Sequence, residues 1–172
     1  MERPDTIVNR DELDWIEREN GDAFALSWKQ LADDAGGKHL GCTLYRLPPG
    51  QRAHPYHFHY ANEEALYVLA GEGLLRCPDG HVVLRRGDYC VLPKGDAGAH
   101  QVINTTEDPL EYLAMSTRRD PEIVYYPDSD KYLLGAKEDP SIWRLVPGDV
   151  ELDYWDGESR DDLPPIPDHD EP

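Results

Sequence analysis

Cysteine, lysine and long apolar runs are all scarce in this chain of 172 residues. Its three cysteines, Cys42, Cys77 and Cys90, are widely spaced and form no CxxC pair, which argues against a zinc site and against a disulfide framework. No apolar run approaches the roughly 20 residues that span a bilayer, and no basic-then-apolar leader opens the sequence. We therefore expect a soluble, cytoplasmic protein with no membrane partner.

Positively charged residues are also few. The chain has 17 lysine and arginine residues and 35 aspartate and glutamate residues, which gives a net charge of −18. Such a surface repels nucleic acids and anionic membranes, so we expect neither as a partner. Arginine outnumbers lysine by 12 to 5. An acidic, lysine-poor surface is typical of a halophilic protein, since carboxylates hold hydrated cations and salt screens their mutual repulsion. An ordinary acidic cytosolic protein is the alternative.

The length favours one domain with an extension at each end. We expect residues 1–38 to form an N-terminal extension, with a short helix that Asn9 caps and Asn20 ends, and a strand over residues 24–28. Residues 118–172 form an acidic C-terminal extension in which the strand pattern weakens and prolines recur. Its large aromatic residues predict that part of it packs on the main body, whereas its last ~10 residues are expected to be extended or disordered.

Between the extensions, residues 39–117 alternate short apolar strands with turn signals at intervals of roughly eight to twelve residues. We expect strands over residues 39–47, 56–59, 64–69, 74–77, 81–84, 89–92, 100–103 and 110–116. No helical periodicity interrupts them. This pattern is typical of an all-β sandwich or small barrel.

Histidines gather where the sequence reads HPYHFH, over residues 54–59. His57 and His59 are two residues apart, so on a strand both imidazoles point to the same face and can reach one point in space. His100 begins another strand, far along the chain. His54 precedes a proline and is expected in a loop, with a contact to a substrate as the alternative.

A carboxylate follows the histidines at the start of the next strand. If Leu66 and Val68 belong to the core, Glu64 points inward beside the histidines. An unpaired inward carboxylate is costly, and a metal ion removes that cost. Glu63 is the rival ligand, because a bulge would reverse the alternation.

Three neutral imidazoles and one carboxylate suit a divalent transition metal such as Fe, Mn, Zn, Ni, Co or Cu, and suit Ca or Mg poorly. Four such ligands leave positions open on an octahedral metal for a substrate, O2 or water. A hydrogen-bonded cluster without metal remains the alternative. No other cofactor-binding motif is found.

Two series of residues in this region resemble the two motifs of the cupin superfamily. The first reads Gly50, His57, His59, Glu64, Gly71, and the second reads Gly87, Pro93, Gly95, His100, Asn104. Two intervals are longer than is typical of the family, by one residue from Gly50 to His57 and by two from Gly95 to His100. The resemblance covers roughly residues 39–117.

This resemblance implies a double-stranded β-helix, or jelly-roll, barrel that binds a metal through His57, His59, Glu64 and His100 and often forms a homodimer. Small cupins of this kind resemble proteins labelled sugar-phosphate isomerase-like. We therefore expect a metal-dependent enzyme that acts on a small molecule by oxidation or by isomerase or lyase chemistry. A non-catalytic cupin that binds a small molecule is the alternative. Catalytic residues cannot be singled out, and Lys94 and Arg52 are the candidates for holding a phosphate.

Overall fold

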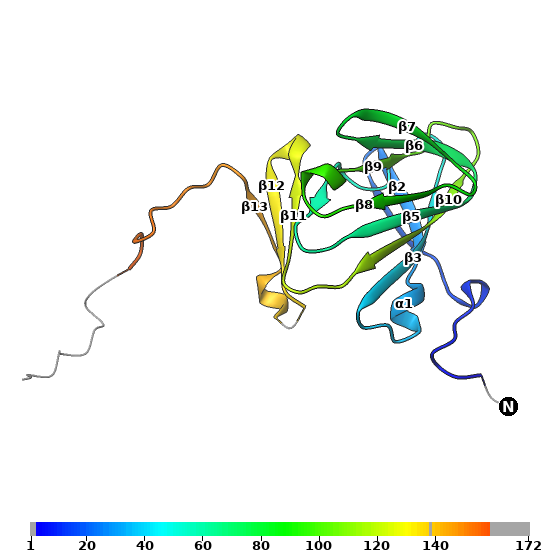
Figure 1. The fold of residues 1–172 in the computed structure, drawn as a ribbon, viewed down its shortest axis with the longest axis horizontal. Helices are drawn as coiled ribbons and strands as arrows, with labels where there is room; N and C mark the ends of the chain where they lie inside the picture. The colour runs from blue at the N-terminus through cyan, green and yellow to red at the C-terminus, as the bar shows by residue number, and fades with distance from the viewer. Residues whose placement is uncertain (1–2, 138, 159–172) are drawn as a thin grey trace, which may run out of the picture.

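The structure is a computed structural model that describes residues 3–137 and 139–158, and it is mostly β (Figure 1). Its largest sheet is antiparallel and has the strand order β1–β2–β3–β10–β5–β8. These strands are β1 (Ile16–Asn20), β2 (Phe24–Lys29), β3 (Leu40–Leu47), β10 (Leu110–Thr117), β5 (Glu64–Ala70) and β8 (Tyr89–Leu92).

Two smaller sheets complete the fold. One has the order β7–β6–β9, with β7 (Gly80–Arg85), β6 (Glu72–Cys77) and β9 (Gln101–Ile103). The other has the order β13–β12–β11–β4, with β13 (Arg144–Pro147), β12 (Lys131–Gly135), β11 (Glu122–Tyr126) and β4 (Phe58–His59). The mostly β fold with jelly-roll sheets agrees with the sequence, but over the described residues the strands do not close into one hydrogen-bonded barrel.

In residues 3–137 and 139–158, helical structure is limited to short segments. They are η1 (Arg10–Glu12), α1 (Leu31–Asp34), η2 (Asp96–Gly98), η3 (Pro127–Ser129) and η4 (Pro140–Ile142). The N-terminal helix expected up to Asn20 is not found, although the Asn9 side chain does accept a hydrogen bond from the Asp11 amide, at 3.0 Å. A short isolated helix is marginal, whereas all five residues of β1 pair with β2, and this pairing gives the segment its structure.

The core lies between the sheets and is aliphatic and aromatic. Its most deeply buried members include Leu47, Val68, Leu110 and Tyr112, each at most 2% exposed. Gly71 shows how closely the strands approach at the β5–β6 turn. Its φ is +80°, and a side chain there would meet the backbone of Pro109, so glycine is required.

The segments that flank the central region extend its sheets. β2 pairs with β3 on one side, and β11 pairs with β4 on the other. Beyond β13 the chain runs away from the body (Figure 1), and Tyr154 and Trp155 are 84% and 70% exposed. The last ~10 residues, expected to be extended or disordered, lie outside the described residues. The division into residues 1–38, 39–117 and 118–172 stays a prediction.

No helix in the described part of the chain is both long enough and apolar enough to cross a bilayer.

Candidate metal centre

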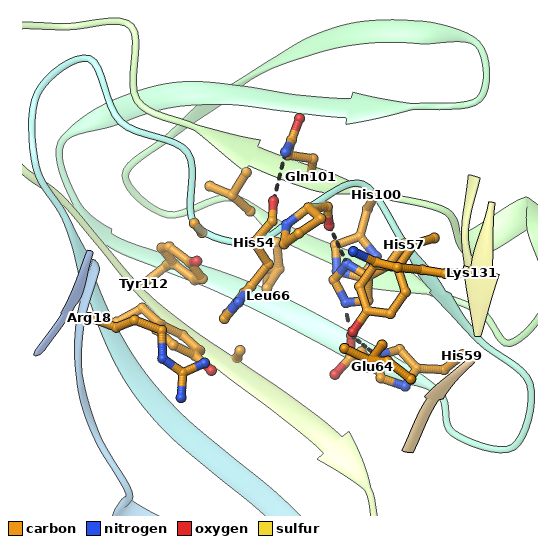
Figure 2. Close-up of a pocket in the computed structure, with 17 residues that line it drawn as sticks. Arg18, His54, His57, His59, Glu64, Leu66, His100, Gln101, Tyr112 and Lys131 are labelled. Carbon is orange, nitrogen blue, oxygen red and sulfur yellow. Dashed lines mark hydrogen bonds and ion pairs between the residues drawn. The ribbon is translucent and has the colours of Figure 1, made fainter. Parts of the chain in front are cut away.

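A cavity of about 390 Å³ opens between the largest sheet and the sheet that contains β4 (Figure 2). The four residues predicted from the sequence as metal ligands all line it: His57, His59, Glu64 and His100. They come from the segment before β4, from β4 itself, from the start of β5 and from the residue before β9. The structure therefore brings residues from three separate stretches of chain to one point.

His57 and His100 are fixed to each other through the backbone. The His57 amide donates to the His100 carbonyl at 3.1 Å, and the His100 amide donates to the His57 carbonyl at 2.8 Å. Their rings lie side by side, with centroids 4.6 Å apart, and the ring of His59 lies 5.2 Å from that of His57. Two backbone bonds thus hold residues from distant parts of the sequence in one geometry.

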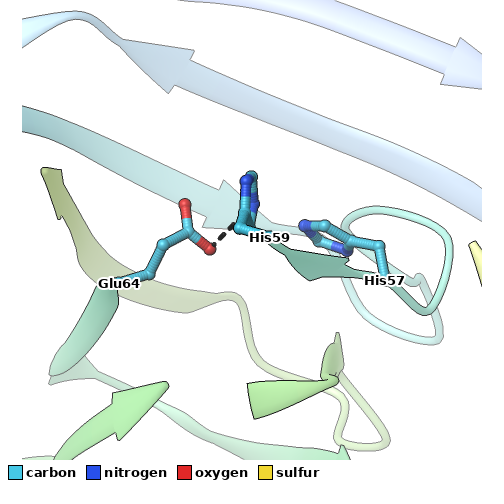
Figure 3. Close-up of side chains that lie close together, drawn as sticks. All are labelled: His57, His59 and Glu64. Carbon is cyan, nitrogen blue, oxygen red and sulfur yellow. Dashed lines mark ion pairs between the residues drawn. The ribbon is translucent and has the colours of Figure 1, made fainter. Parts of the chain in front are cut away.

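Glu64 faces the cavity because of strand alternation. Leu66 and Val68, on the same face of β5, are 3% and 1% exposed, whereas Glu63 is exposed. The Oε2 atom of Glu64 lies 3.3 Å from Nε2 of His59, the ion pair drawn in Figure 3, and 3.5 Å from Nε2 of His100. His57, His59 and Glu64 each offer a ligand atom within 4.8 Å of the others, and His100 adjoins this group through Glu64.

Backbone carbonyls set the orientation of two imidazoles. Nδ1 of His57 lies 2.8 Å from the Pro55 carbonyl, and Nδ1 of His100 lies 2.9 Å from the Gly98 carbonyl. A carbonyl only accepts, so each Nδ1 carries the proton and donates. The Nε2 lone pair of each neutral ring is then left for the cavity, which is the arrangement of metal-binding histidines.

The longer interval between Gly95 and His100 has a structural role. It contains η2, whose last residue, Gly98, supplies the carbonyl that orients His100. A Cβ at Gly98 would overlap the Pro93 carbonyl oxygen, so only glycine allows this turn to fold so tightly. The departure from the usual motif spacing therefore positions a ligand rather than displacing it.

A second carboxylate, that of Glu122, lies near the Nδ1 atom of His59. This Nδ1 atom lies 3.5 Å from Oε2 of Glu122 and has no closer hydrogen-bond partner within the described chain. Glu122, the first residue of β11, accepts hydrogen bonds from the Asn62 side chain and from the Ala61 amide. The sequence analysis missed this residue, because only the pairing of β11 with β4 brings it to the histidine.

Burial and nearby charge determine the protonation of the cluster. Burial, followed by His100 and His59, lowers the pKa of His57 to about 3, and burial also lowers the pKa of His100. For His59, burial acts in the same direction, but the carboxylates of Glu122 and Glu64 raise its pKa to about 9. Burial would raise the pKa of Glu64, but its bond to His59 holds that pKa well below its usual range.

The residues fit a transition metal. The His100 Nε2 lone pair and the half-buried Glu64 carboxylate face each other at 3.5 Å, and two acceptors this close without a proton between them are unfavourable. A cation removes this conflict, and nitrogen and carboxylate donors in this ratio are those that Fe, Mn, Zn, Ni, Co and Cu prefer.

The rest of the cavity wall is partly aromatic and partly basic. It includes Tyr45, His54, Tyr112 and Tyr126, together with the basic side chains of Arg18 and Lys131. Lys94 and Arg52, the candidates from the sequence for holding a phosphate, do not line it. Arg18 and Lys131 were missed because they lie in the extensions, far in sequence from both motifs.

Known proteins resemble this chain in sequence and in fold. Residues 43–116 match the family model described as "Cupin domain". A curated relative from Thermotoga maritima, an oxalate-binding protein, is 34% identical over 70 residues, which are 41% of this chain and 55% of the relative. The chain thus spans about half the length of that relative.

Two solved structures match over most of the chain. A candidate sugar phosphate isomerase from Acidithiobacillus ferrooxidans has a TM-score of 0.75 and 28% identity, covering 86% of this chain and 96% of its own. A sugar phosphate isomerase of the cupin superfamily from Silicibacter pomeroyi has a TM-score of 0.74 and 26% identity, covering 83% of this chain and 93% of its own.

Proposed function

We propose that this chain is a cupin, that it binds a divalent transition metal through His57, His59, Glu64 and His100, and that it converts a small molecule bound beside the metal. One observation carries this proposal. The carbonyls of Pro55 and Gly98 orient two imidazoles so that each Nε2 lone pair is left for the cavity, and the one of His100 lies 3.5 Å from the Glu64 carboxylate, which is also an acceptor. A metal-free cluster leaves that conflict in place.

The proposed chemistry is proton transfer next to a polarised carbonyl, as in an isomerase or lyase. A metal bound here supplies a Lewis acid that polarises a carbonyl or hydroxyl oxygen of the substrate. His54 lines the cavity three residues before His57, and the centroid of its ring lies 5.4 Å from that of Tyr45 in a T-shaped arrangement. Burial keeps this imidazole neutral at pH 7, because it lowers the pKa to about 4, and a neutral imidazole can accept a proton. Oxidation with O2 remains the competing chemistry.

The named relatives support a substrate rich in oxygen. Two are sugar phosphate isomerases by name, one of them a candidate, and the third is named for binding oxalate. The last name favours a second candidate function, in which the chain holds a small anion without converting it. The homodimer expected from the resemblance stays a prediction.

Metal content tests the first part of the proposal. Elemental analysis of the purified, tag-free protein should find one transition metal per chain, and the His59→Ala and His100→Ala variants should lose most of it. His81→Ala is the matched control, because His81 is exposed on β7 and does not line the cavity. Full metal content in the His59→Ala variant would contradict the ligand set.

Turnover separates the two candidate functions. The metal-loaded protein is incubated with aldose and ketose phosphates and with 2-oxo acids, and the products are followed by NMR. Oxygen consumption is recorded in parallel. Product formation that His54→Gln abolishes supports the isomerase or lyase, whereas oxygen consumption points to oxidation. Saturable binding without any product supports the non-catalytic alternative.

A further inference from the structure

Arg18 lies on a strand at the edge of the largest sheet. In the pairing of β1 with β2 it lies opposite Leu26, a core residue that is 5% exposed. Paired residues of antiparallel strands present their side chains to the same face, so Arg18 lies on the face of the sheet that carries Leu26, with its side chain exposed, while Glu17 and Glu19 lie on the other face. Its guanidinium lies 5.4 Å from the ring of Trp28 and lines the cavity.

Lys131 has an equivalent position on the other wall. In the pairing of β11 with β12 it lies opposite Tyr126, which also lines the cavity. Its ammonium group lies 5.2 Å from the Tyr126 ring. In the view of Figure 2, Lys131 is drawn on one side of the cavity and Arg18 on the opposite side, with Leu66 between them.

Arg18 and Lys131 form no ion pair with a carboxylate of the described part of the chain, where the basic side chains that do so are those of Arg3, Arg10, Arg46, Arg76 and Arg118. Other basic side chains also lack such a partner, but Arg18 and Lys131 are the arginine and the lysine that line this cavity. Lys131 is half-buried and Arg18 is exposed. Positive charges that line one cavity raise the local concentration of anions there.

The two cations and the proposed metal ligands come from different parts of the chain. His57, His59, Glu64 and His100 all lie within the family match over residues 43–116. Arg18 and Lys131 lie outside it, in strands that the flanking segments add to the sheets. The part of the chain shared with the family thus supplies the proposed metal centre, and the flanking segments supply the charge.

We infer that the cavity takes a small molecule with two negatively charged ends, one beside Lys131 and the proposed metal ligands and the other bound by the Arg18 guanidinium. Arginine presents a planar pair of N–H donors that match the oxygens of a carboxylate or a phosphate, so either can be the outer group. This inference deepens the proposed function and rests on it, because the inner end of the ligand lies at the proposed metal centre.

Calorimetry on the full-length, Mn2+-loaded protein tests the inference with two pairs of probes. 3-Phosphoglycerate, which carries a carboxylate and a phosphate, is compared with glycerate, and succinate is compared with its monoamide, succinamate. We expect the wild type to bind the more highly charged probe of at least one pair about tenfold or more tightly than its partner, since hydrogen bonds between charged groups contribute this much. The pair that shows the preference distinguishes a phosphate from a carboxylate.

Variants of Arg18 test whether this residue causes the preference for the more highly charged probe of each pair. Arg18→Gln should remove it, and Arg18→Lys should retain only part of it, because lysine keeps the charge and loses the paired donors. Arg86→Gln, which removes the same charge from an exposed turn outside the cavity, should leave the preference intact. If Arg18→Gln fails to fold, Arg18→Lys decides the question.

Mn2+ affinity is measured first in every variant, so that two failures can be told apart. A wild type that binds no Mn2+ overturns the proposed function. A wild type that binds Mn2+ but none of the four probes, or shows no preference within either pair, overturns the inference about Arg18. A preference that survives in Arg18→Gln overturns it as well.

Discussion

At the scale of single residues, the site depends on atoms that face away from the cavity. The carbonyls of Pro55 and Gly98 and the carboxylate of Glu122 each lie beside the Nδ1 atom of one imidazole. A ring fixed in this way loses less freedom when its Nε2 atom binds a metal. Glu122 is therefore a positioning residue for His59.

Replacing Glu122 with glutamine tests this role. Glutamine keeps the size of the side chain, but its single oxygen can accept from only one of Ala61 and Asn62, which bond to different oxygens of Glu122, and it removes the negative charge beside His59. We expect Mn2+ affinity to fall about tenfold, with a small loss of stability from the hydrogen bond that is not kept. Glu63→Gln is the matched control, because Glu63 is exposed next to the site. Equal Mn2+ affinities in the two variants would rule out the positioning role.

His54 makes stability depend on pH. Burial lowers its pKa to about 4 in the folded protein, whereas a histidine in an unfolded chain titrates near 6.5. As the pH falls below 6.5 the unfolded chain binds a proton that the folded protein does not, so stability is lost between about pH 6.5 and pH 4. Between pH 7 and pH 5 this loss is up to about 2 kcal/mol.

Urea unfolding of the metal-free protein at pH 7 and pH 5 measures that loss. His54→Gln should lose less unfolding free energy over this interval than the wild type, by the amount assigned to His54. His81→Gln makes the same change at an exposed position and should follow the wild type. Parallel profiles for all three proteins would show that His54 does not titrate as described.

At the scale of elements, the sequence predicted the strands of the central region well. The segments expected over residues 39–47 and 64–69 correspond to β3 and β5, because alternation and turn signals act locally. The N-terminal helix was wrong, since pairing with β2 outweighed the local signal of the Asn9 cap. Arg18, Lys131 and Glu122 could not be predicted as neighbours of the cavity, because strand pairing in the flanking segments brings them there.

The η2 turn offers a test of how an element positions a ligand. In Gly98→Ala the new Cβ would overlap the Pro93 carbonyl, so the turn must shift and take with it the carbonyl that orients His100. We expect weaker Mn2+ binding and a loss of about 1–3 kcal/mol in unfolding free energy, as for other overpacked sites. The exposed Ala97→Gly, on the same turn, should preserve Mn2+ affinity. Normal Mn2+ binding by Gly98→Ala would show that η2 does not position His100.

At the scale of the whole molecule, the net charge of −18 dominates the behaviour expected in solution. Mutual repulsion destabilises the compact state, and salt screens it over about 10 Å at 0.1 M ionic strength and about 3 Å at 1 M. We therefore expect the unfolding free energy to rise between 0.1 and 1 M KCl. Equal stability at both concentrations would argue against the halophilic interpretation.

A variant with fewer carboxylates provides the control for that measurement. The exposed carboxylates chosen for replacement by glutamine are those of Glu17, Glu19, Glu107 and Glu151. This variant carries four fewer negative charges, so its stability should depend less on KCl if repulsion is the cause. An unchanged dependence would point to a general effect of the salt instead.

The cavity is lined partly by residues within the family match and partly by residues of the flanking strands. This arrangement affects how the ligand preference of such proteins can change during evolution. Of the proposed metal ligands, His57 and His100 are tied to each other by mutual backbone bonds within the central region. Arg18 and Lys131 lie on β1 and β12, which the flanking segments add outside the family match, and take no part in those bonds. We therefore expect related chains to keep the proposed metal centre and to differ in ligand preference through substitutions in the segments that flank the central region.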